Sequence, residues 1–265
     1  MKATVFLGGG RITNALVAGL RLAGYAKPIV VHDRNALKLN DLKRHYGVEI
    51  EPDLHRAVDA ARVLTIAVRP DSVPALLKEI GTEKIRRSLT VVSLAAGVPL
   101  SKLGSYLRRP VKWARAMPSP VCRTGRGLTA LTFGRGFHAG SRAEVRELFS
   151  LVGAVVEIPE NQFDAFTVTF SSSHGYHALA ALISAAENIG LDRKTARLAA
   201  AHALADGIAA WCESESSLEE LLQEAATPGG TAAAVMDEFD CSGYGKTIVR
   251  GLRAGMKQAA RNARG

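Results

Sequence analysis

The sequence has little cysteine, no apolar run long enough to span a bilayer, and no concentrated basic arm. Its three cysteines, Cys122, Cys212 and Cys241, lie far apart and in no metal-ligand spacing. We therefore expect unpaired thiols in a reducing cytoplasm and no metal site. The apolar runs fall short of the roughly 18–20 residues that a membrane helix needs. No basic segment followed by an apolar one precedes the first strand-like stretch, so we expect neither secretion nor membrane insertion.

The pattern of charge excludes a second class of protein. The formal net charge is +9 at pH 7, but lysines and arginines are scattered, with only short clusters at residues 84–87, 108–109 and 257–264. A nucleic-acid-binding domain gathers its basic residues on one face or in one arm. We therefore expect no nucleic-acid partner. We interpret the charge as solvated surface that also attracts a phosphorylated cofactor or an anionic substrate.

The first 160 residues alternate short β-like runs with amphipathic helices, the pattern of a parallel α/β sheet. Nearly all-apolar runs such as residues 63–67 suit a sheet that is covered on both faces. The sequence therefore predicts a doubly wound α/β domain over residues 1–160. We expect strands at residues 4–7, 29–32, 63–67, 90–93, 112–115, 128–132 and 154–157. We expect helices between them at residues 13–22, 36–46, 54–60, 72–80, 101–106 and 142–151.

After Pro159 the β signals almost vanish, and alanine and leucine dominate. We expect an all-α domain over residues 161–265. Asp192 is a good N-cap, and the serines and glutamates of residues 216–220 predict another. The small apolar faces of these helices exceed what one bundle needs, so we expect a homodimer formed by helix-to-helix packing. The expected helices are residues 163–189, 192–213, 217–225, 231–239 and 245–261.

A glycine turn joins the first expected strand to the first helix. Gly8 would allow a tight turn, and Gly10 would let the backbone approach a pyrophosphate at the positive end of the helix dipole, where Arg11 and Ile12 open the helix. Thr13 stands where the G-x-G-x-x-G fingerprint has its third glycine. A glycine triplet alone is often only a tight loop. Its place between a strand and a helix favours a dinucleotide-binding Rossmann domain.

The second expected strand is followed by Asp33, Arg34 and Asn35, where a Rossmann domain meets the adenine ribose. Asp33 favours NAD through the ribose 2′-hydroxyl, whereas Arg34, with Asn35 and Lys38, favours the 2′-phosphate of NADP. We expect NADP(H) to be preferred and leave NAD(H) open. The alternative is that Arg34 is only a solvated turn residue.

Three further strand ends should face the same edge of the sheet, where open α/β sheets bind ligands. We interpret Gly97 and the small residues before it as a surface on which a nicotinamide or ribose lies. A proline-rich turn would form a wall of the same pocket. The residues that we assign to the cofactor here are Ala67, Val68, Arg69, Pro70, Ala95, Ala96, Gly97, Met117 and Pro118.

Two polar stretches interrupt the apolar helical half. Residues 171–177 include Ser172, Ser173 and His174, and buried polar groups need partners, so we expect this stretch to face a cavity or the other domain. The Thr-Pro-Gly-Gly-Thr run at residues 227–231 is typical of a helix start, whose N–H groups suit a carboxylate. Either stretch could instead be structural capping.

In order and spacing, these segments resemble the pyrroline-5-carboxylate reductase family over essentially the whole chain. The glycine turn resembles F-I-G-x-G-N-M-A, residues 67–70 resemble A-V-K-P, and residues 93–98 resemble S-x-A-A-G-V. Residues 115–119 resemble R-x-M-P-N, residues 164–167 resemble D-x-x-T, and residues 227–231 resemble S-P-G-G-T. The resemblance implies an N-terminal Rossmann domain followed by a helical dimerisation domain.

The resemblance also implies a reaction. Members of this family transfer a hydride from NAD(P)H to the C=N carbon of a small cyclic imino acid, and 1-pyrroline-5-carboxylate becomes L-proline in proline biosynthesis. The resemblance implies that Gly230, Thr231 and Ala232 form the substrate-binding turn, between helices of two subunits. It implies that Glu215 matches an acidic residue near the substrate.

The chain departs from the family pattern around the imine. The last threonine of S-P-G-G-T-T, whose hydroxyl contacts the imine nitrogen in the family, is Ala232 here. The segment S-G-S-G-P-A-Y reads as residues 170–176, which bring in His174 and the bulky Phe170, and the asparagine of M-P-N-T-P is Ser119. These changes point to a paralogue with a different imine substrate as a second interpretation.

We expect Ser172, Ser173 or His174 to polarise the imine in place of the missing hydroxyl, with His174 acting as a general acid near neutral pH. The alternative is a structural His174 at a domain interface. A β-hydroxyacid dehydrogenase shares the architecture but has a lysine on its interdomain helix, and no lysine occurs between Lys112 and Lys194. A catalytically silent NADP-binding protein is the remaining alternative.

Overall fold

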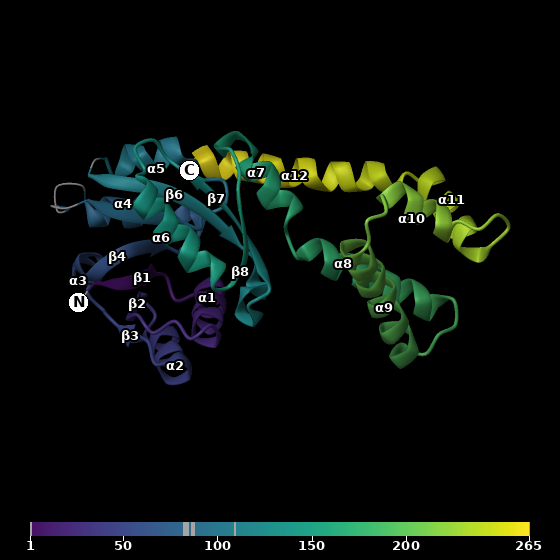
Figure 1. The fold of residues 1–265 in the computed structure, drawn as a ribbon, viewed down its shortest axis with the longest axis horizontal. Helices are drawn as coiled ribbons and strands as arrows, with labels where there is room; N and C mark the ends of the chain where they lie inside the picture. Colours follow the sequence, from purple (N-terminus) through teal and green to yellow (C-terminus); the bar gives the residue numbers. More distant parts are fainter. Residues whose placement is uncertain (1, 82–84, 86–87, 109, 265) are drawn as a thin grey trace. The chain divides into compact units, whose positions relative to one another are not determined.

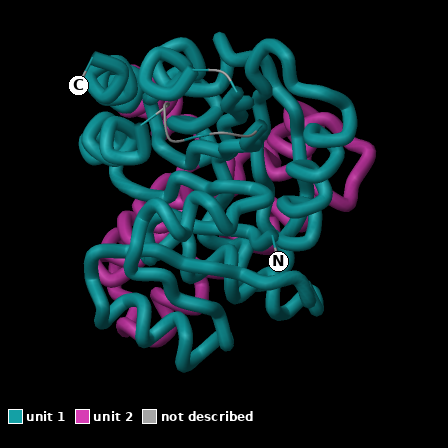
Figure 2. The backbone as a smooth tube through the Cα atoms, turned by 90° about the vertical axis from the view of Figure 1, so that its left-hand side faces the viewer, with its two compact units in different colours: residues 1–170, 254–265 teal, residues 171–253 magenta. Residues whose placement is uncertain are grey.

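The computed structural model describes residues 2–81, 85, 88–108 and 110–264 (Figure 1). Four positions of the basic clusters noted in the sequence, 84, 86, 87 and 109, lie outside the described residues. The chain forms two compact units, shown in different colours in Figure 2. Unit 1 comprises residues 1–170 and 254–265, and unit 2 comprises residues 171–253. The chain therefore returns to unit 1 through its last helix.

Unit 1 contains an eight-stranded sheet in the order β3-β2-β1-β4-β5-β6-β7-β8. Neighbouring strands run parallel, except that β6 and β7 are antiparallel. The order of the first six strands is that of a Rossmann domain, so the expected doubly wound α/β fold is confirmed. The strands are β1 (Ala3–Leu7), β2 (Ile29–His32), β3 (Glu49–Ile50), β4 (Ala61–Ile66), β5 (Leu89–Ser93), β6 (Val111–Pro118), β7 (Gly127–Phe133) and β8 (Gly153–Glu157).

All seven strands expected from the sequence are present, and two features of the sheet were not expected. The strand β3 has only two residues, which is too few to show the alternation by which a strand is recognised. The strand β7 runs antiparallel to β6 because the short turn η3 (Pro120–Thr124) joins them directly. A parallel pair would need a longer crossover connection.

Helices cover both faces of the sheet and bury two apolar clusters. The helices α1, α2 and α6 pack on one face, and α3, α4 and α5 pack on the other. Successive residues of a strand point to opposite faces. Phe6 therefore packs in the cluster beneath α1, α2 and α6, whereas Val5 and Leu7 pack in the cluster beneath α3, α4 and α5. The helices are α1 (Arg11–Leu22), α2 (Ala36–Tyr46), α3 (Leu54–Ala60), α4 (Val73–Ile80), α5 (Leu100–Tyr106) and α6 (Ala139–Ser150), with the turn η1 (Pro70–Ser72) before α4.

The single helix expected over residues 163–189 is wrong. The structure has two helices in its place, α7 (Glu160–Thr169) and α8 (Ser173–Asn188), and the break falls in a run of serines. The hydroxyls of Ser171 and Ser173 are hydrogen-bonded at 2.6 Å, and the Ser173 amide donates to Ser171 Oγ at 3.4 Å. Serine side chains compete with the helix for backbone partners. The serine run therefore ends α7 and begins α8.

Unit 2 is built from helices, and two of their expected N-caps are confirmed. Asp192 accepts from the amides of Lys194 and Thr195, and Ser217 forms a capping box with Glu220. Among the described residues, no helix is both long enough and apolar enough to cross a membrane. The helices are α8, α9 (Arg193–Glu213), α10 (Leu218–Ala225), α11 (Thr231–Cys241) and the first part of α12 (Tyr244–Arg264).

Candidate functional site

The glycine turn after β1 packs tightly against β4. Gly8 has φ +111°, and a Cβ at this position would lie 2.6 Å from the carbonyl oxygen of Ala67. The Gly8 amide donates to the His32 carbonyl at 2.7 Å, which ties the turn to β2. Thr13 is fully buried and donates from Oγ1 to the Gly8 carbonyl at 2.5 Å. Thr13 therefore stabilises the turn by a hydrogen bond of its own.

The start of α1 has open space in front of it. Gly10 is the N-cap, and a Cβ there would meet no atom of the described residues within 4 Å. The first amides of a helix have no acceptor within the helix, and a glycine cap offers them no side-chain oxygen. Arg11 is exposed and Ile12 is half-buried in this first turn. Open backbone, N–H donors and a positive charge together fit the pyrophosphate of a dinucleotide.

Asp33 has a structural role that we did not expect from the sequence. Its Oδ2 accepts from the Gly9 amide at 2.7 Å, and its Oδ1 accepts from the Asn35 amide at 2.8 Å. Asn35 is in turn the N-cap of α2, with Oδ1 accepting from the Leu37 amide at 3.0 Å. The carboxylate of Asp33 therefore holds the glycine turn to the turn after β2, at the residue that would favour NAD by binding a ribose.

Arg34 lies at the rim of a cavity of about 430 Å³ beside the glycine turn. The Arg34 side chain is 79% exposed, and its Nη2 lies 2.7 Å from Oε2 of Glu79 on α4. Gly8 also lines the cavity, and Val68 and Leu76 contribute apolar surface to it. Asp33 and Asp71 line it as well, so Arg34 is the cationic member of a mixed polar edge. An apolar wall with an arginine at its edge fits a nucleoside that carries a phosphate group.

The segment after β4 forms part of the same cavity. The Ala67 amide donates to the Leu7 carbonyl at 2.8 Å, which extends the pairing of β4 with β1. Ala67 and Val68 are half-buried, Arg69 is exposed, and Pro70 is the first residue of η1. The predicted A-V-R-P segment thus lies at the carboxyl end of β4, beside the glycine turn.

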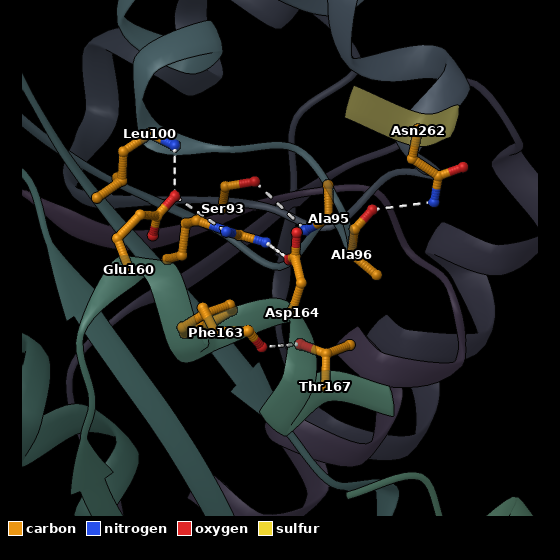
Figure 3. A network of polar contacts seen from close by, with 10 residues as sticks. Ser93, Ala95, Ala96, Leu100, Glu160, Phe163, Asp164, Thr167 and Asn262 are labelled. Carbon is orange, nitrogen blue, oxygen red and sulfur yellow. Dashed lines mark hydrogen bonds and ion pairs between the residues drawn. The ribbon is translucent and has the colours of Figure 1, made fainter. Parts of the chain in front are cut away.

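The loop after β5 meets the last helix of the chain (Figure 3). The Ala95 amide donates to Ser93 Oγ at 3.3 Å, and the Ala96 carbonyl accepts from Nδ2 of Asn262 at 3.1 Å. Gly97 has φ +76°, and a Cβ there would lie 2.6 Å from the carbonyl oxygen of Ala259. Position 97 is therefore glycine because α12 fills the space beside it. This contact is a second reason for a glycine here, beside the surface that we expect for a nicotinamide or ribose.

A buried arginine on β6 organises the neighbouring elements. The Arg115 side chain is 1% exposed, its Nη1 lies 3.0 Å from Glu160 Oε1, and its Nη2 lies 2.7 Å from Asp164 Oδ1. The guanidinium carbon lies 4.3 Å from the centroid of the Phe163 ring. Glu160 Oε1 also accepts from the Leu100 amide at the start of α5 (Figure 3). These contacts fix β6 just before the residues that we assigned to the nicotinamide wall.

The importance of Arg115 was missed in the sequence, where it was noted only as part of a motif. One signal was present, because Arg115 lies between Ala114 and Ala116, and a charged residue among small apolar ones needs partners. In the same segment Met117 is half-buried and Pro118 is buried. Ser119, which replaces the family's asparagine, accepts from the Val121 amide at 3.1 Å and so begins η3.

The first group of residues assigned to the substrate side lies at the start of α8 in unit 2. Ser172 is the N-cap of this helix and is half-buried, whereas Ser173 and His174 are exposed in the single chain. The His174 amide donates to the Ser171 carbonyl at 3.1 Å. The three side chains therefore project from one helix start.

The second group lies at the start of α11, also in unit 2. Gly230 is the N-cap, and its amide donates to the Thr227 carbonyl at 2.8 Å. Thr231 and Ala232 are the first two residues of the helix and are exposed, so the helix start expected at residues 227–231 is confirmed. Glu215 is exposed in the connection between α9 and α10. A helix start of this kind presents N–H donors to an anion.

Three of the cofactor candidates, Gly8, Arg34 and Val68, line one cavity of unit 1, whereas Ala95, Ala96, Gly97, Met117 and Pro118 are not among its lining residues. The parallel strands β1, β2, β4, β5 and β6 all end at the same edge of the sheet, the edge at which doubly wound folds bind ligands. The glycine turn and the segments after β2 and β4 line one cavity. The substrate-side candidates come from two helix starts and one connection of unit 2.

Two family models match the chain. Residues 160–262 match the model for pyrroline-5-carboxylate reductase dimerisation, and residues 4–97 match the model described as NADP oxidoreductase, coenzyme F420-dependent. A pyrroline-5-carboxylate reductase of Corynebacterium melassecola is 32% identical over 260 residues, covering 96% of both chains. A relative of the same name from Synechocystis sp. is 28% identical over 96% of this chain and 95% of its own.

Solved structures extend the likeness to the whole fold. The NADP-bound pyrroline carboxylate reductase of Plasmodium falciparum superposes with a TM-score of 0.89 at 18% identity, over 99% of this chain and 98% of that one. A pyrroline-5-carboxylate reductase from Coxiella burnetii superposes with a TM-score of 0.86 at 25% identity, over the same shares. Both units of this chain therefore have counterparts in proteins of this kind.

Proposed function

The chain belongs to the pyrroline-5-carboxylate reductase family, and on that premise we propose that it reduces the C=N bond of 1-pyrroline-5-carboxylate with NAD(P)H to give L-proline. The proposal rests on the end-to-end identity with a pyrroline-5-carboxylate reductase, 32% over 96% of both chains. It is supported by a glycine turn and an adjoining cavity that fit a dinucleotide. The chain would thus be an oxidoreductase of proline biosynthesis.

We propose NADP(H) as the preferred cofactor, with NAD(H) possible. The amides around Gly10, Arg11 and Ile12 would hold the pyrophosphate, and Arg34 would bind the 2′-phosphate. Two observations support this preference: the Arg34 guanidinium is exposed at the cavity rim, and both carboxylate oxygens of Asp33 already accept backbone amides. A paired arginine and phosphate form a strong charge-assisted interaction. When bound, the cofactor supplies the hydride.

We propose that the helix starts of unit 2 handle the substrate. The first amides of α11, at Gly230, Thr231 and Ala232, would bind the substrate carboxylate, and Glu215 would lie near the ring. The polar start of α8, with His174 and its neighbouring serines Ser172 and Ser173, would polarise the imine nitrogen and hold a proton there. Positioning and fixed charge would supply most of the remaining catalysis.

We propose two domains with different functions. Residues 1–160 bind the cofactor, and residues 161–265 bind the substrate and form the contacts of a homodimer. The match of residues 160–262 to the dimerisation model supports this division. We place the reaction in the cytoplasm, with no nucleic-acid partner. Three cysteines without disulfides support a reducing compartment.

The test is steady-state oxidation of NADPH by the full-length protein with 1-pyrroline-5-carboxylate, beside six-membered and 2-carboxylate imine analogues. We expect turnover with 1-pyrroline-5-carboxylate to exceed turnover with each analogue. NADPH binding without turnover of any imine would contradict the proposal and favour a silent cofactor-binding protein.

Ala232 supports a second candidate function, which is reduction of a different cyclic imine. The family threonine at this position contacts the imine nitrogen, and alanine cannot donate that hydrogen bond. Turnover with only one of the analogues would establish this second function. The variant Ala232→Thr would then be expected to shift preference toward 1-pyrroline-5-carboxylate, measured as the ratio of kcat/KM values for the two imines.

A further inference from the structure

The last turns of α12 belong to unit 1, although the helix begins in unit 2. Three contacts attach this end to unit 1. The Lys102 side chain on α5 donates to the Ala263 carbonyl at 2.7 Å, and a Cβ at Gly255 would lie 2.9 Å from the Val168 side chain. The third contact is with the loop of residues 95–97, where Asn262 donates to the Ala96 carbonyl. The end of α12 therefore contacts α5, α7 and the loop after β5.

The loop of residues 95–97 is packed at Ala95, which belongs to a core cluster, but it has few polar contacts of its own. Its side chains are two methyl groups and a hydrogen, and Gly97 has a backbone conformation with positive φ. The hydrogen bond from the Ala95 amide to Ser93 is long, at 3.3 Å. Among the described residues, the side chain from another element that hydrogen-bonds to the backbone of this loop is Asn262, at 3.1 Å. Helix α12 also fills the space beside Gly97, since its Ala259 is 6% exposed and in backbone contact there.

We propose that the end of α12 positions the loop of residues 95–97 for the cofactor, with Asn262 as the positioning residue. This inference rests on the proposed function, because the loop matters to catalysis only if the edge of the sheet binds NADPH. A loop that must be ordered when the cofactor binds costs binding free energy. Asn262 removes that cost in advance by holding the Ala96 carbonyl.

The matched control lies one turn earlier on the same helix. Gln258 is exposed and donates from Nε2 to Oδ1 of Asn262 at 3.0 Å. Both residues carry an amide group on α12, but only the amide of Asn262 bonds to the loop. Asn262→Ala and Gln258→Ala therefore remove the same chemical group from the same helix, with and without the loop contact.

The experiment measures NADPH affinity of the full-length protein by the fluorescence of the bound cofactor. It adds amide hydrogen exchange over residues 94–98 in the absence of cofactor. For Asn262→Ala we expect the Kd and KM for NADPH to rise about three- to tenfold, the loss of one hydrogen bond of typical net strength. Exchange over residues 94–98 should become faster, while kcat and the KM for the imine stay within about twofold of the parent. Gln258→Ala removes a bond to Asn262 Oδ1 but leaves the Asn262 donor on Ala96, so it should leave all five quantities within about the same twofold range.

The variant Asn262→Asp distinguishes the hydrogen bond that Asn262 donates to the loop from the space that its side chain fills. The aspartate keeps the size of the side chain but cannot donate to the Ala96 carbonyl, so it should weaken NADPH binding at least as much as Asn262→Ala. Equal NADPH affinity and loop exchange in the parent and Asn262→Ala would overturn the proposal. A parent that binds NADPH but reduces no imine would refute the proposed function while leaving this comparison intact. A parent that does not bind NADPH would overturn both.

Discussion

Units 1 and 2 bury their apolar residues in different ways. Unit 1 has two clusters of fully buried side chains, one on each face of the sheet. In unit 2 the buried residues are two alanines of α9, Ala196 and Ala200. Large apolar side chains of unit 2 are exposed in the single chain. They include Leu198, Ile208, Trp211, Leu218, Leu222, Val235, Phe239, Ile248 and Val249.

This difference shows that one chain can combine a core that it completes by itself with apolar surface that another chain must cover. The core of unit 1 is complete within one chain, because helices cover both faces of its sheet. The helices of unit 2 carry apolar side chains at a density typical of a core, but the single chain does not cover them. Exposed apolar surface on this scale marks an interface, and the matching dimerisation model covers the same helices. We therefore expect the stability of unit 2 to depend on formation of the homo-oligomer, and so on protein concentration.

The largest effect is expected from a charge placed on the uncovered surface of α9. Ile208 is 61% exposed in the single chain, and Ile208→Glu would place a carboxylate on the face that we expect to form the interface. Burying an unpaired charge costs several kcal/mol, so we expect the dissociation constant of the oligomer to rise by about a hundredfold or more. Light scattering after size-exclusion chromatography over a concentration series measures this.

The control is Lys194→Glu, which changes the charge of an exposed residue on the same helix. It should leave the oligomer intact. If Ile208→Glu also left the oligomer intact, this face of α9 would not be an interface. The comparison between the units would then have to be explained in another way.

The second effect concerns the internal contacts of unit 1. Arg115→Met removes a buried guanidinium and leaves Glu160 and Asp164 with an unpaired charge, which costs about 3–5 kcal/mol of unfolding free energy. Arg44→Met is the control, because Arg44 pairs with Asp41 at the surface and such a pair contributes less than about 1 kcal/mol.

The two tryptophans allow this measurement to be restricted to unit 1. Trp113 is buried in unit 1 and Trp211 is half-exposed in unit 2, so Trp211→Phe leaves a single fluorescent reporter of unit 1. In that background, urea unfolding followed by fluorescence should show a much lower midpoint for Arg115→Met than for Arg44→Met. Equal midpoints would mean that the buried ion pairs add nothing to unit 1 beyond what hydrophobic packing supplies.

Local signals in the sequence were sufficient for most of the fold. Seven strands and the N-caps at Asp192 and Ser217 were predicted from residues within a few positions of each other. The glycine turn was predicted in the same way, since Gly8 follows a strand and precedes a helix. The break between α7 and α8 is also local in cause, but a run of serines can either cap a helix or continue it. Sequence alone did not decide between these outcomes.

Contacts between distant segments could not be predicted. Arg115 bonds to Glu160 and Asp164, which are 45 and 49 residues away in the sequence. Ala96 bonds to Asn262 across 166 residues. No local pattern announces such a partner, because each arises from the way that the elements pack. These long-range contacts lie around the candidate cofactor site, which is why its outline was predicted and its internal support was not.

The third effect tests whether cofactor choice belongs to unit 1. Arg34→Ala should raise the KM for NADPH about tenfold, since it removes a charge-assisted contact to the 2′-phosphate, and should leave the KM for NADH nearly unchanged. The KM for the imine should not move. Initial rates at varied NADPH and NADH concentrations measure the effect.

Thr231→Val is the reciprocal variant in unit 2. It should raise the KM for the imine and leave both cofactor KM values as they are. An Arg34→Ala enzyme with an unchanged ratio of NADPH to NADH preference would show that Arg34 is only a solvated turn residue. A Thr231→Val enzyme with altered cofactor KM values would show that the two units do not divide the substrates between them.

The smallest effect comes from the neighbour of Arg34 within unit 1. The Glu79 carboxylate lies 2.7 Å from the Arg34 guanidinium, so it competes with a 2′-phosphate for the same donors. Both side chains are exposed, and such a pair contributes less than about 1 kcal/mol. Glu79→Gln should therefore lower the KM for NADPH by only about two- to fivefold, and added salt should reduce the difference by screening. In the Arg34→Ala background, Glu79→Gln should no longer lower the KM for NADPH, because Glu79 then has no arginine whose N–H donors it could occupy. If Glu79→Gln improved the KM for NADPH equally in the presence and absence of Arg34, its carboxylate would act by general repulsion of the phosphate, and the ion pair would have no part in cofactor choice.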